Sequence, residues 1–233
     1  MSVPSRDQSA ELILSLQPPA WHLRHSRAVA ETAAWLAWRA AEAGRSVDRR
    51  LVEAAALLHD IDKLERVRAD VAELGHGDAA AEWLARDGWP ELGPAIAGHA
   101  VTRLADGAWF EEWLVSATTE ALIVSYADKR AGQRLESMAD RFASWERRYP
   151  VTQRAARPRA TWTPEILAAV RARAAELERR VCKLASVAPG DVRRLAWTVR
   201  ALAAARAAVP ATPVVPVTPA VPATVTSSTR RPS

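Results

Sequence analysis

The pair His59-Asp60 places two metal-type ligands side by side at the end of the apolar run from Leu51 to Leu58. Imidazole nitrogen and carboxylate oxygen are ligands that borderline divalent cations accept. Neighbouring positions on a helix point about 100° apart, so the pair can bind one ion, or two ions if the carboxylate bridges them. The pair therefore predicts a metal site, and a metal site of this kind supports metal-assisted hydrolysis.

Further candidate ligands lie on other expected helices or at their starts. The complete predicted set is His25, His59, Asp60, His76, His99 and Asp128. The glycines on either side of His76 let the backbone come close to a neighbour at a helix start. A lone helical histidine is more often a surface or core residue, so the prediction depends on the whole set. Only His22 is left out, although it shares a helix face with His25.

The order and context of these residues resemble the HD-domain metal-dependent phosphohydrolase superfamily. Residues 57–63, LLHDIDK, are similar to the LLHDIxK run of that superfamily, and residues 126–129, YADK, to its terminal ADK. The order H, HD, H, H, D is similar to the subgroup that usually holds two metals. The resemblance covers residues 1–150 and implies two divalent ions, such as iron or manganese, bridged by Asp60. Asp62 departs from the commoner glycine or alanine, and we expect it to orient His59 or to face solvent.

The resemblance implies a phosphohydrolase or phosphodiesterase, in which a metal-activated water attacks a nucleotide or another small phosphate ester. Dinucleoside polyphosphates are among the candidate substrates. Asp60 and Lys63 are the predicted catalytic residues. Lys63, Arg103 and Lys129 are the predicted substrate contacts, and Arg103 is included because it follows His99 by four residues on one expected helix.

Two alternatives from other classes stay open. A mixed-valence diiron oxygenase of the same superfamily shares this ligand order, so the ligands alone do not separate oxidation from hydrolysis. In a binding or regulatory module, the basic C-terminal helices would instead recognise RNA, DNA or a protein partner.

The elements that must position these residues are predicted to be helical throughout, because Ala and Leu dominate and no run alternates apolar with polar residues. The fold class is therefore all-α, with an HD-domain helical bundle, a C-terminal helical extension and a disordered tail. Ser46 or Asp48 is an expected N-cap, Thr163 is another, and Pro164 suits a first helical turn. The expected helices are at about 8–17, 21–43, 48–61, 77–87, 90–103, 108–115, 118–131, 134–148, 164–185 and 190–207.

Charge and composition suggest where the domains divide. Residues 1–150 hold 18 Lys or Arg against 23 acidic residues, whereas residues 151–233 hold 14 against 4. We expect an HD domain at 1–150, a basic helical extension at 151–208 and a disordered tail rich in Pro, Thr and Val at 209–233. The basic surface could attract an anionic substrate, nucleic acid or the acidic half of another subunit.

Composition also limits location and partners. The single Cys182 rules out an intramolecular disulfide, and the N-terminus lacks the layout of a secretion signal. Five prolines interrupt the uncharged stretch 207–229, so it is not a membrane span. We expect a cytoplasmic protein without a membrane partner. Its partner is a phosphorylated small molecule or nucleotide; nucleic acid is less favoured and a homodimer is left open.

Overall fold

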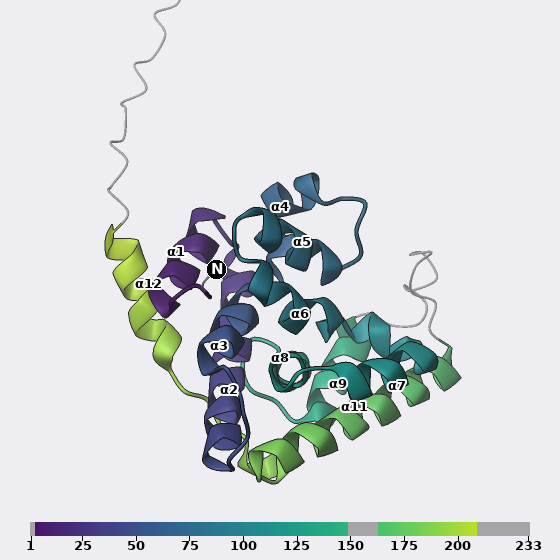
Figure 1. The fold of residues 1–233 in the computed structure, drawn as a ribbon. Coiled ribbons are helices and arrows are strands. Elements are labelled where there is room, and N and C mark those ends of the chain that lie inside the picture. Colours follow the sequence, from purple (N-terminus) through teal and green to yellow (C-terminus); the bar gives the residue numbers. More distant parts are fainter. Residues whose placement is uncertain (1–2, 149–162, 209–233) are drawn as a thin grey trace, which may run out of the picture.

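The computed structural model describes residues 3–148 and 163–208, and these residues fold into helices with no named strand (Figure 1). The all-α prediction is confirmed. The predicted tail at 209–233 lies outside the described residues. The α-helices are α1 (Arg6–Ser15), α2 (Ala20–Glu42), α3 (Arg49–Leu58), α4 (Glu65–Asp70), α5 (Asp78–Arg86), α6 (Gly93–Ile96), α7 (Gly107–Ser116), α8 (Thr119–Arg130), α9 (Met138–Arg148), α11 (Pro164–Ala185) and α12 (Trp197–Ala208). The short 3-10 helices are η1 (Ile61–Lys63), η2 (Pro90–Leu92), η3 (Ala97–His99), η4 (Val101–Ala105) and η5 (Pro189–Asp191).

Several helices begin where a side chain satisfies a backbone amide of the first turn. The Asp48 carboxylate accepts from Leu51 N at 3.0 Å, and the Thr163 hydroxyl accepts from Ile166 N at 3.3 Å. Pro164 follows Thr163 at the first helical position, where its missing N–H costs nothing. Of the alternatives Ser46 and Asp48, the N-cap is Asp48, and the predicted cap at Thr163 is confirmed. Each such cap is typically worth about 1 kcal/mol.

Helix α8 runs through the middle of the molecule and is seen nearly end-on in Figure 1. It contacts α2, α3, α6 and α11. Ile123, Val124 and Ala127 have no exposed surface, in keeping with a helix that is covered on most sides. This position fixes Asp128, near the end of α8, beside α2 and the end of α3.

The segment 90–105 is not the single helix that was expected. It is divided into η2, α6, η3 and η4, and Ala100 between η3 and η4 has an extended backbone, with ψ at 130°. Gly93, Pro94 and Gly98 weaken the helix. In addition, a Cβ on Gly98 would collide with the Trp113 indole, so the backbone lies directly against that ring. The expected helix 48–61 also ends earlier, at Leu58, and α4 was not predicted.

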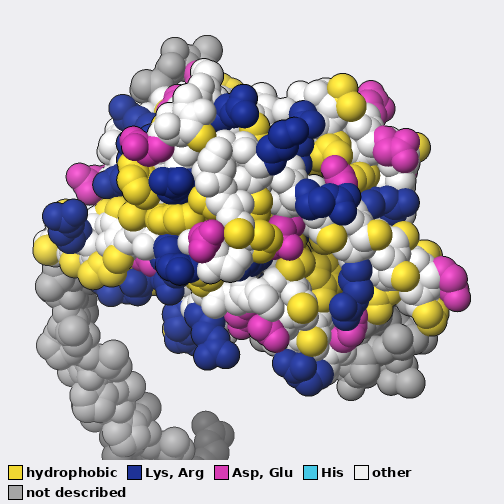
Figure 2. Space-filling model, turned by 90° about the horizontal axis from the view of Figure 1, so that it is seen from below, with side chains coloured by type: hydrophobic (Ala, Val, Ile, Leu, Met, Phe, Trp, Pro, Cys, Tyr) yellow, Lys and Arg dark blue, Asp and Glu magenta, His cyan; other side chains and the backbone are white. Residues whose placement is uncertain are grey.

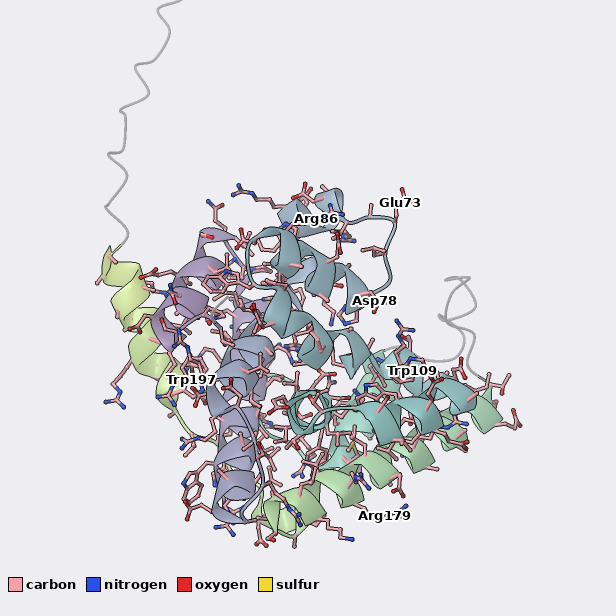
Figure 3. The ribbon with its side chains drawn as sticks, viewed as in Figure 1. Glu73, Asp78, Arg86, Trp109, Arg179 and Trp197 are labelled. Atoms are coloured by element: carbon pink, nitrogen blue, oxygen red, sulfur yellow. The ribbon has the colours of Figure 1, made fainter. Side chains whose placement is uncertain are left out.

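The helices of the predicted basic extension share the core of the preceding residues. Helix α11 packs on α2 and α8, and α12 packs on α1 and α2. Leu177 and Val181 have no exposed surface, and both belong to the main apolar cluster. Trp197, labelled in Figure 3, donates its Nε1 hydrogen to Ala30 O in α2 at 3.5 Å. The described part of this extension is therefore continuous with the rest of the fold.

Several basic side chains of this extension have partners within the molecule. Arg194 pairs with the buried Glu31, and Arg171 pairs with Glu146. Arg173 donates to Leu104 O at 2.7 Å. On the face shown in Figure 2, Lys and Arg side chains lie in separate groups with acidic and apolar side chains between them. Within the described ranges, no helix has the length and apolar character needed to cross a bilayer.

Candidate metal centre

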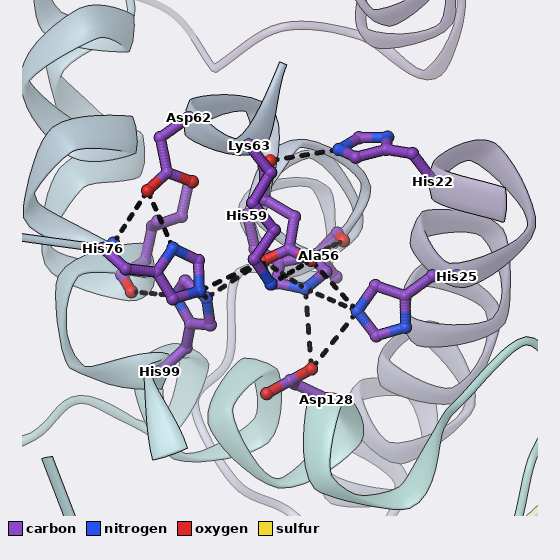
Figure 4. A network of polar contacts seen from close by, with 12 residues as sticks. His22, His25, Ala56, His59, Asp62, Lys63, His76, His99 and Asp128 are labelled. Carbon is purple, nitrogen blue, oxygen red and sulfur yellow. Dashed lines mark hydrogen bonds and ion pairs between the residues drawn. The ribbon is translucent and has the colours of Figure 1, made fainter. Parts of the chain in front are cut away.

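Helices α2 and α8 and the end of α3 bring four of the predicted ligands together. His25 Nε2 lies 3.2 Å from His59 Nε2, 3.2 Å from Asp60 Oδ2 and 3.3 Å from Asp128 Oδ1 (Figure 4). We call His25, His59, Asp60 and Asp128 the first cluster. Two imidazole nitrogens and two carboxylates converge on one point, which is a donor set that divalent transition metals accept.

A second group of donors adjoins the first and shares Asp60 with it. His76 Nε2 lies 3.1 Å from His99 Nε2, and Asp60 Oδ1 lies 3.3 Å from His76 Nε2 and 3.4 Å from His99 Nε2. We call His76, His99 and Asp60 the second cluster. The structure thus brings all six predicted ligands together, with the carboxylate of Asp60 between the two clusters.

A hydrogen bond fixes the orientation of every histidine in the two clusters, with a backbone carbonyl as the partner in three of them and the Asp62 carboxylate in the fourth. In each ring Nδ1 faces an oxygen that can only accept a hydrogen bond, so Nδ1 carries a hydrogen and Nε2 is the nitrogen left to bind a cation or a second proton. The partners are Gly132 O for His25 at 2.7 Å, Ala56 O for His59 at 2.9 Å, Asp62 Oδ2 for His76 at 2.7 Å and Ile96 O for His99 at 2.7 Å. Two facing lone pairs repel unless a cation or a proton lies between them. The arrangement therefore fits a pair of metal ions.

Charges within the clusters shift the pKa values of their members. Burial opposes a charge on His25, but the carboxylates of Asp128 and Asp60 outweigh it and raise its pKa to about 9. Burial also opposes a charge on His76, and Asp60 and Asp62 nevertheless raise its pKa to about 9. For His99, burial prevails and lowers the pKa to about 4. Protons on His25 and His76 thus stabilise the carboxylates in the metal-free protein, and a metal ion would have to displace them.

The carboxylates of Asp60 and Asp128 are both held ionised. Burial alone would raise the pKa of Asp60, but His59 and Lys63 keep it well below its usual range. Burial also acts against Asp128, whose hydrogen bonds to His25 and His59 keep its pKa low as well. Both groups are therefore anionic at neutral pH and able to bind a cation.

Asp62 orients His76 and not His59, contrary to the sequence-based expectation. It is buried, and its Oδ2 accepts from His76 Nδ1 at 2.7 Å and from Gly77 N at 3.3 Å. The difference arises because α3 ends at Leu58, and the 3-10 turn η1 then carries Asp62 toward the start of α5.

Gly77 allows the second cluster to form. Its φ is +90°, a conformation that L-residues with a side chain rarely adopt. A Cβ there would lie 2.8 Å from Ala97 O and 3.4 Å from the His99 ring. The predicted close backbone approach beside His76 is therefore present, and it brings the start of α5 against η3.

His22, which was left out of the ligand set, binds the backbone of Asp60 and not a metal position. It is fully buried, and its Nε2 lies 3.0 Å from Asp60 O. The bond fixes the backbone of the residue that joins the two clusters. Sequence reasoning missed this role, although the position of His22 one turn before His25 was a usable signal.

The three predicted substrate contacts occupy different surroundings. Lys63 Nζ donates to Asp60 Oδ2 at 2.7 Å, and its side chain is 40% exposed at the edge of the clusters. Lys129 is buried and donates to His99 O at 2.5 Å, so it ties α8 to η3 and thereby positions His99.

Arg103 does not share a helix face with His99, because the backbone turns at Ala100. That part of the prediction was wrong. Arg103 pairs with Asp78 and lies over the Trp109 ring at 5.2 Å. Arg103, Asp78 and Trp109 line a second cleft that reaches His76 from the side of α5 and η4.

A cavity of about 260 Å³ gives access to both clusters. Of the ligands, His25, Asp60, His76 and Asp128 line it, whereas His59 and His99 are at most 1% exposed. The rest of its wall consists of Trp21, Lys63, Val101, Lys129, Gly132, Gln133, Arg141, Phe142 and Trp145.

The helical fold and the two clusters define an α-helical domain with a histidine and aspartate metal site. A family model described as the HD domain matches residues 23–132, a range that includes all six cluster residues. Residues 23–132 therefore form an HD domain, and HD domains are generally metal-dependent hydrolases. Comparison with curated proteins and with solved structures gives no match. The matched range leaves out α1, α9, α11 and α12, although these helices complete the same fold.

Proposed function

We propose that this protein is a phosphohydrolase that uses two divalent metal ions to hydrolyse a small phosphate ester. The observation that carries the proposal is the pair of facing Nε2 atoms in each cluster, at 3.2 and 3.1 Å, with the Asp60 carboxylate between the pairs. Each Nδ1 is engaged by an oxygen, so each ring presents its Nε2 to the cations, which would displace the protons on His25 and His76.

The donors divide unequally between the two ions. The first cluster would supply four protein ligands, and the second would supply His76, His99 and the shared Asp60. Three protein ligands leave room for water and substrate, which is a common feature of catalytic metal sites. When bound, the ions would supply Lewis-acid chemistry, because they lower the pKa of a water and neutralise charge on phosphoryl oxygens.

The chain itself would orient the substrate and limit access to the centre. Lys63 is the cation that lies next to Asp60 while keeping 40% of its side chain exposed, so its ammonium can turn to a phosphate oxygen. His59 and His99 are at most 1% exposed, so the line of approach is the cavity beside His25 and His76. A phosphate ester entering there would meet Lys63 and the shared carboxylate ligand together.

The test combines metal analysis with product release. Protein purified without chelator should contain close to two metal ions per chain and release phosphate or a nucleotide from a panel of mononucleotides, dinucleoside polyphosphates and glycerol phosphate. Asp60→Asn should lose both the metal and the activity, because Asp60 serves both clusters. Asp78→Asn is the matched control, since Asp78 is a nearby acidic residue paired with Arg103 outside the clusters.

Other outcomes would contradict the proposal in specific ways. One ion per chain in the active protein would restrict the metal to one cluster and make the other a substrate contact. Iron together with oxygen consumption and no phosphate release would favour the diiron oxygenase. Activity that survives in Asp60→Asn would remove the shared carboxylate from the mechanism.

A further inference from the structure

The cavity wall beyond the metal clusters is aromatic and cationic. Trp21 comes from α2, and Arg141, Phe142 and Trp145 come from α9. These two helices border the opening that also exposes Lys63. The proposed function uses the clusters and Lys63 but gives no role to the rings.

Trp21 is an exposed residue at the mouth of the cavity that leads to the buried clusters. It lies four residues before His25 on α2, so it projects from the same helix face one turn earlier. It is 47% exposed, and among the described residues it is the largest of the exposed apolar side chains. Its ring meets the His22 ring edge-on, at 5.5 Å between centroids. Single exposed apolar residues are common, but this one lines the cavity that leads to the clusters.

Helix α9 contributes a cation and two rings from another part of the chain. Arg141 and Trp145 are four residues apart and line the same cavity. Arg141 Nε donates to Ala131 O at 3.0 Å, which fixes the guanidinium and, among the described residues, leaves its terminal nitrogens for an anion. Phe142 is 4% exposed, with Arg171 over its ring at 5.6 Å, so it forms a firm wall.

We propose that this wall is a base-binding subsite and that the substrate is a nucleotide. The inference rests on the proposed function for the position of the phosphate, which lies at the clusters near Lys63 and Arg141. The planar base lies against Trp21 and Trp145, because indole rings stack on any base without needing a particular hydrogen-bond pattern. A cavity of about 260 Å³ suits a single small ligand.

The wall is poorly suited to a sugar phosphate or polyol phosphate. The hydroxyl groups of such a ligand donate hydrogen bonds, and side-chain carboxylates or amides are the groups that accept them. Outside the clusters, Gln133 is the one described lining residue with such a group, and its Oε1 already accepts from Arg24 Nε at 2.5 Å. The chemistry of the wall therefore favours a ring over a chain of hydroxyls.

The experiment compares nucleoside monophosphates with glycerol phosphate as substrates of the metal-loaded protein. Trp21→Ala should raise KM for the nucleotide about tenfold, the loss expected for one base stack, with little change in kcat. KM for glycerol phosphate should not change, and Trp21→Phe should restore most of the nucleotide affinity. Trp38→Ala is the control, since Trp38 lies on the same helix outside the cavity. Circular dichroism checks that each variant is folded.

Two results would overturn the subsite while leaving the proposed function intact. One is equal weakening of both substrates in Trp21→Ala, and the other is a wild-type preference for glycerol phosphate. If no phosphate ester is hydrolysed, the proposed function fails, and calorimetry with a mononucleotide and the metal-loaded protein still tests the subsite. Weaker binding to Trp21→Ala supports it, and no binding to the wild type refutes it.

Discussion

Replacing Asp62 by alanine should weaken metal binding at the second cluster and spare the first. Asp62 Oδ2 is the acceptor that holds His76 Nδ1 at 2.7 Å. The other three histidines use backbone carbonyls for the same purpose, and these carbonyls remain in the variant. Without the carboxylate, the His76 ring can rotate or change tautomer, and its Nε2 lone pair then no longer faces the second ion.

Two independent considerations give the size of the effect. Loss of the partner that orients a metal-binding histidine costs about 10- to 100-fold in metal affinity. That corresponds to about 1.4 to 2.7 kcal/mol. A hydrogen bond to a charged group contributes about 1.5–3 kcal/mol, which is the same range. Because Asp62 and His76 are the two ends of one such bond, the upper half of the range is expected here.

Calorimetric titration of the metal-free protein with Mn²⁺ would measure the two sites. The weaker binding step should shift by the stated factor in Asp62→Ala, and the tighter step should stay within about twofold. Asp62→Asn should fall between the two, because the amide oxygen can still accept from His76. Asp78→Ala removes a neighbouring acid outside the clusters and serves as the charge control. Equal weakening of both steps, or none in Asp62→Ala, would refute the assignment of Asp62 to His76.

Three further predictions follow from the same geometry. His25 and His76 have pKa values of about 9 in the folded protein, above their ordinary value of 6.5. Their protonated rings therefore contribute their full stabilisation of the metal-free fold below pH 6.5, and this contribution is lost as the pH rises to 9. The Tm of the metal-free protein should therefore fall across this window while metal affinity rises, and a flat Tm profile would contradict the charge assignment. His22→Ala removes the bond to Asp60 O and should lower affinity for both ions in the same titration, although His22 is not a ligand. Leu177→Ala should lower the free energy of unfolding, measured with urea, by about 2–5 kcal/mol, as expected for a buried leucine. A decrease below about 1 kcal/mol would contradict the packing of α11 on the core.

The sequence was sufficient to identify which residues gather at the centre but not how they are oriented. His25, His59, Asp60 and Asp128 were identified from residue type, from their order along the chain and from the resemblance to the HD-domain superfamily. The partner of each Nδ1 is a matter of tertiary packing, since Gly132 O reaches His25 from the chain beyond α8. Spacing along the sequence carries no information about such contacts.

The residues that start and end helices explain where the prediction of secondary structure succeeded and where it failed. Thr163 and Pro164 mark the start of α11 within the sequence itself, and that boundary was predicted correctly. In segment 90–105, the glycines were compatible with one weak helix or with several turns. The sequence does not reveal that Trp113 of α7 packs directly on Gly98, and this contact accompanies the division into several short turns. Arg103 was misplaced for the same reason, because its predicted position assumed an unbroken helix.

The unequal charge of the two halves suggested a domain boundary. In the structure, however, basic side chains of the C-terminal half pair with acidic side chains of the N-terminal half. Glu31 belongs to the acidic half, is 2% exposed, and pairs with Arg194 of the basic half. Glu146 pairs with Arg171 in the same way. Arginine side chains can cover apolar surface with their stems while their charged ends find carboxylates or carbonyls, so a basic helix can dock on an acidic domain without losing its ion partners. Opposite net charges in consecutive segments are therefore as consistent with docking as with separation. Here the buried Glu31 also accepts a hydrogen bond from Thr198 in α12, so α12 is docked.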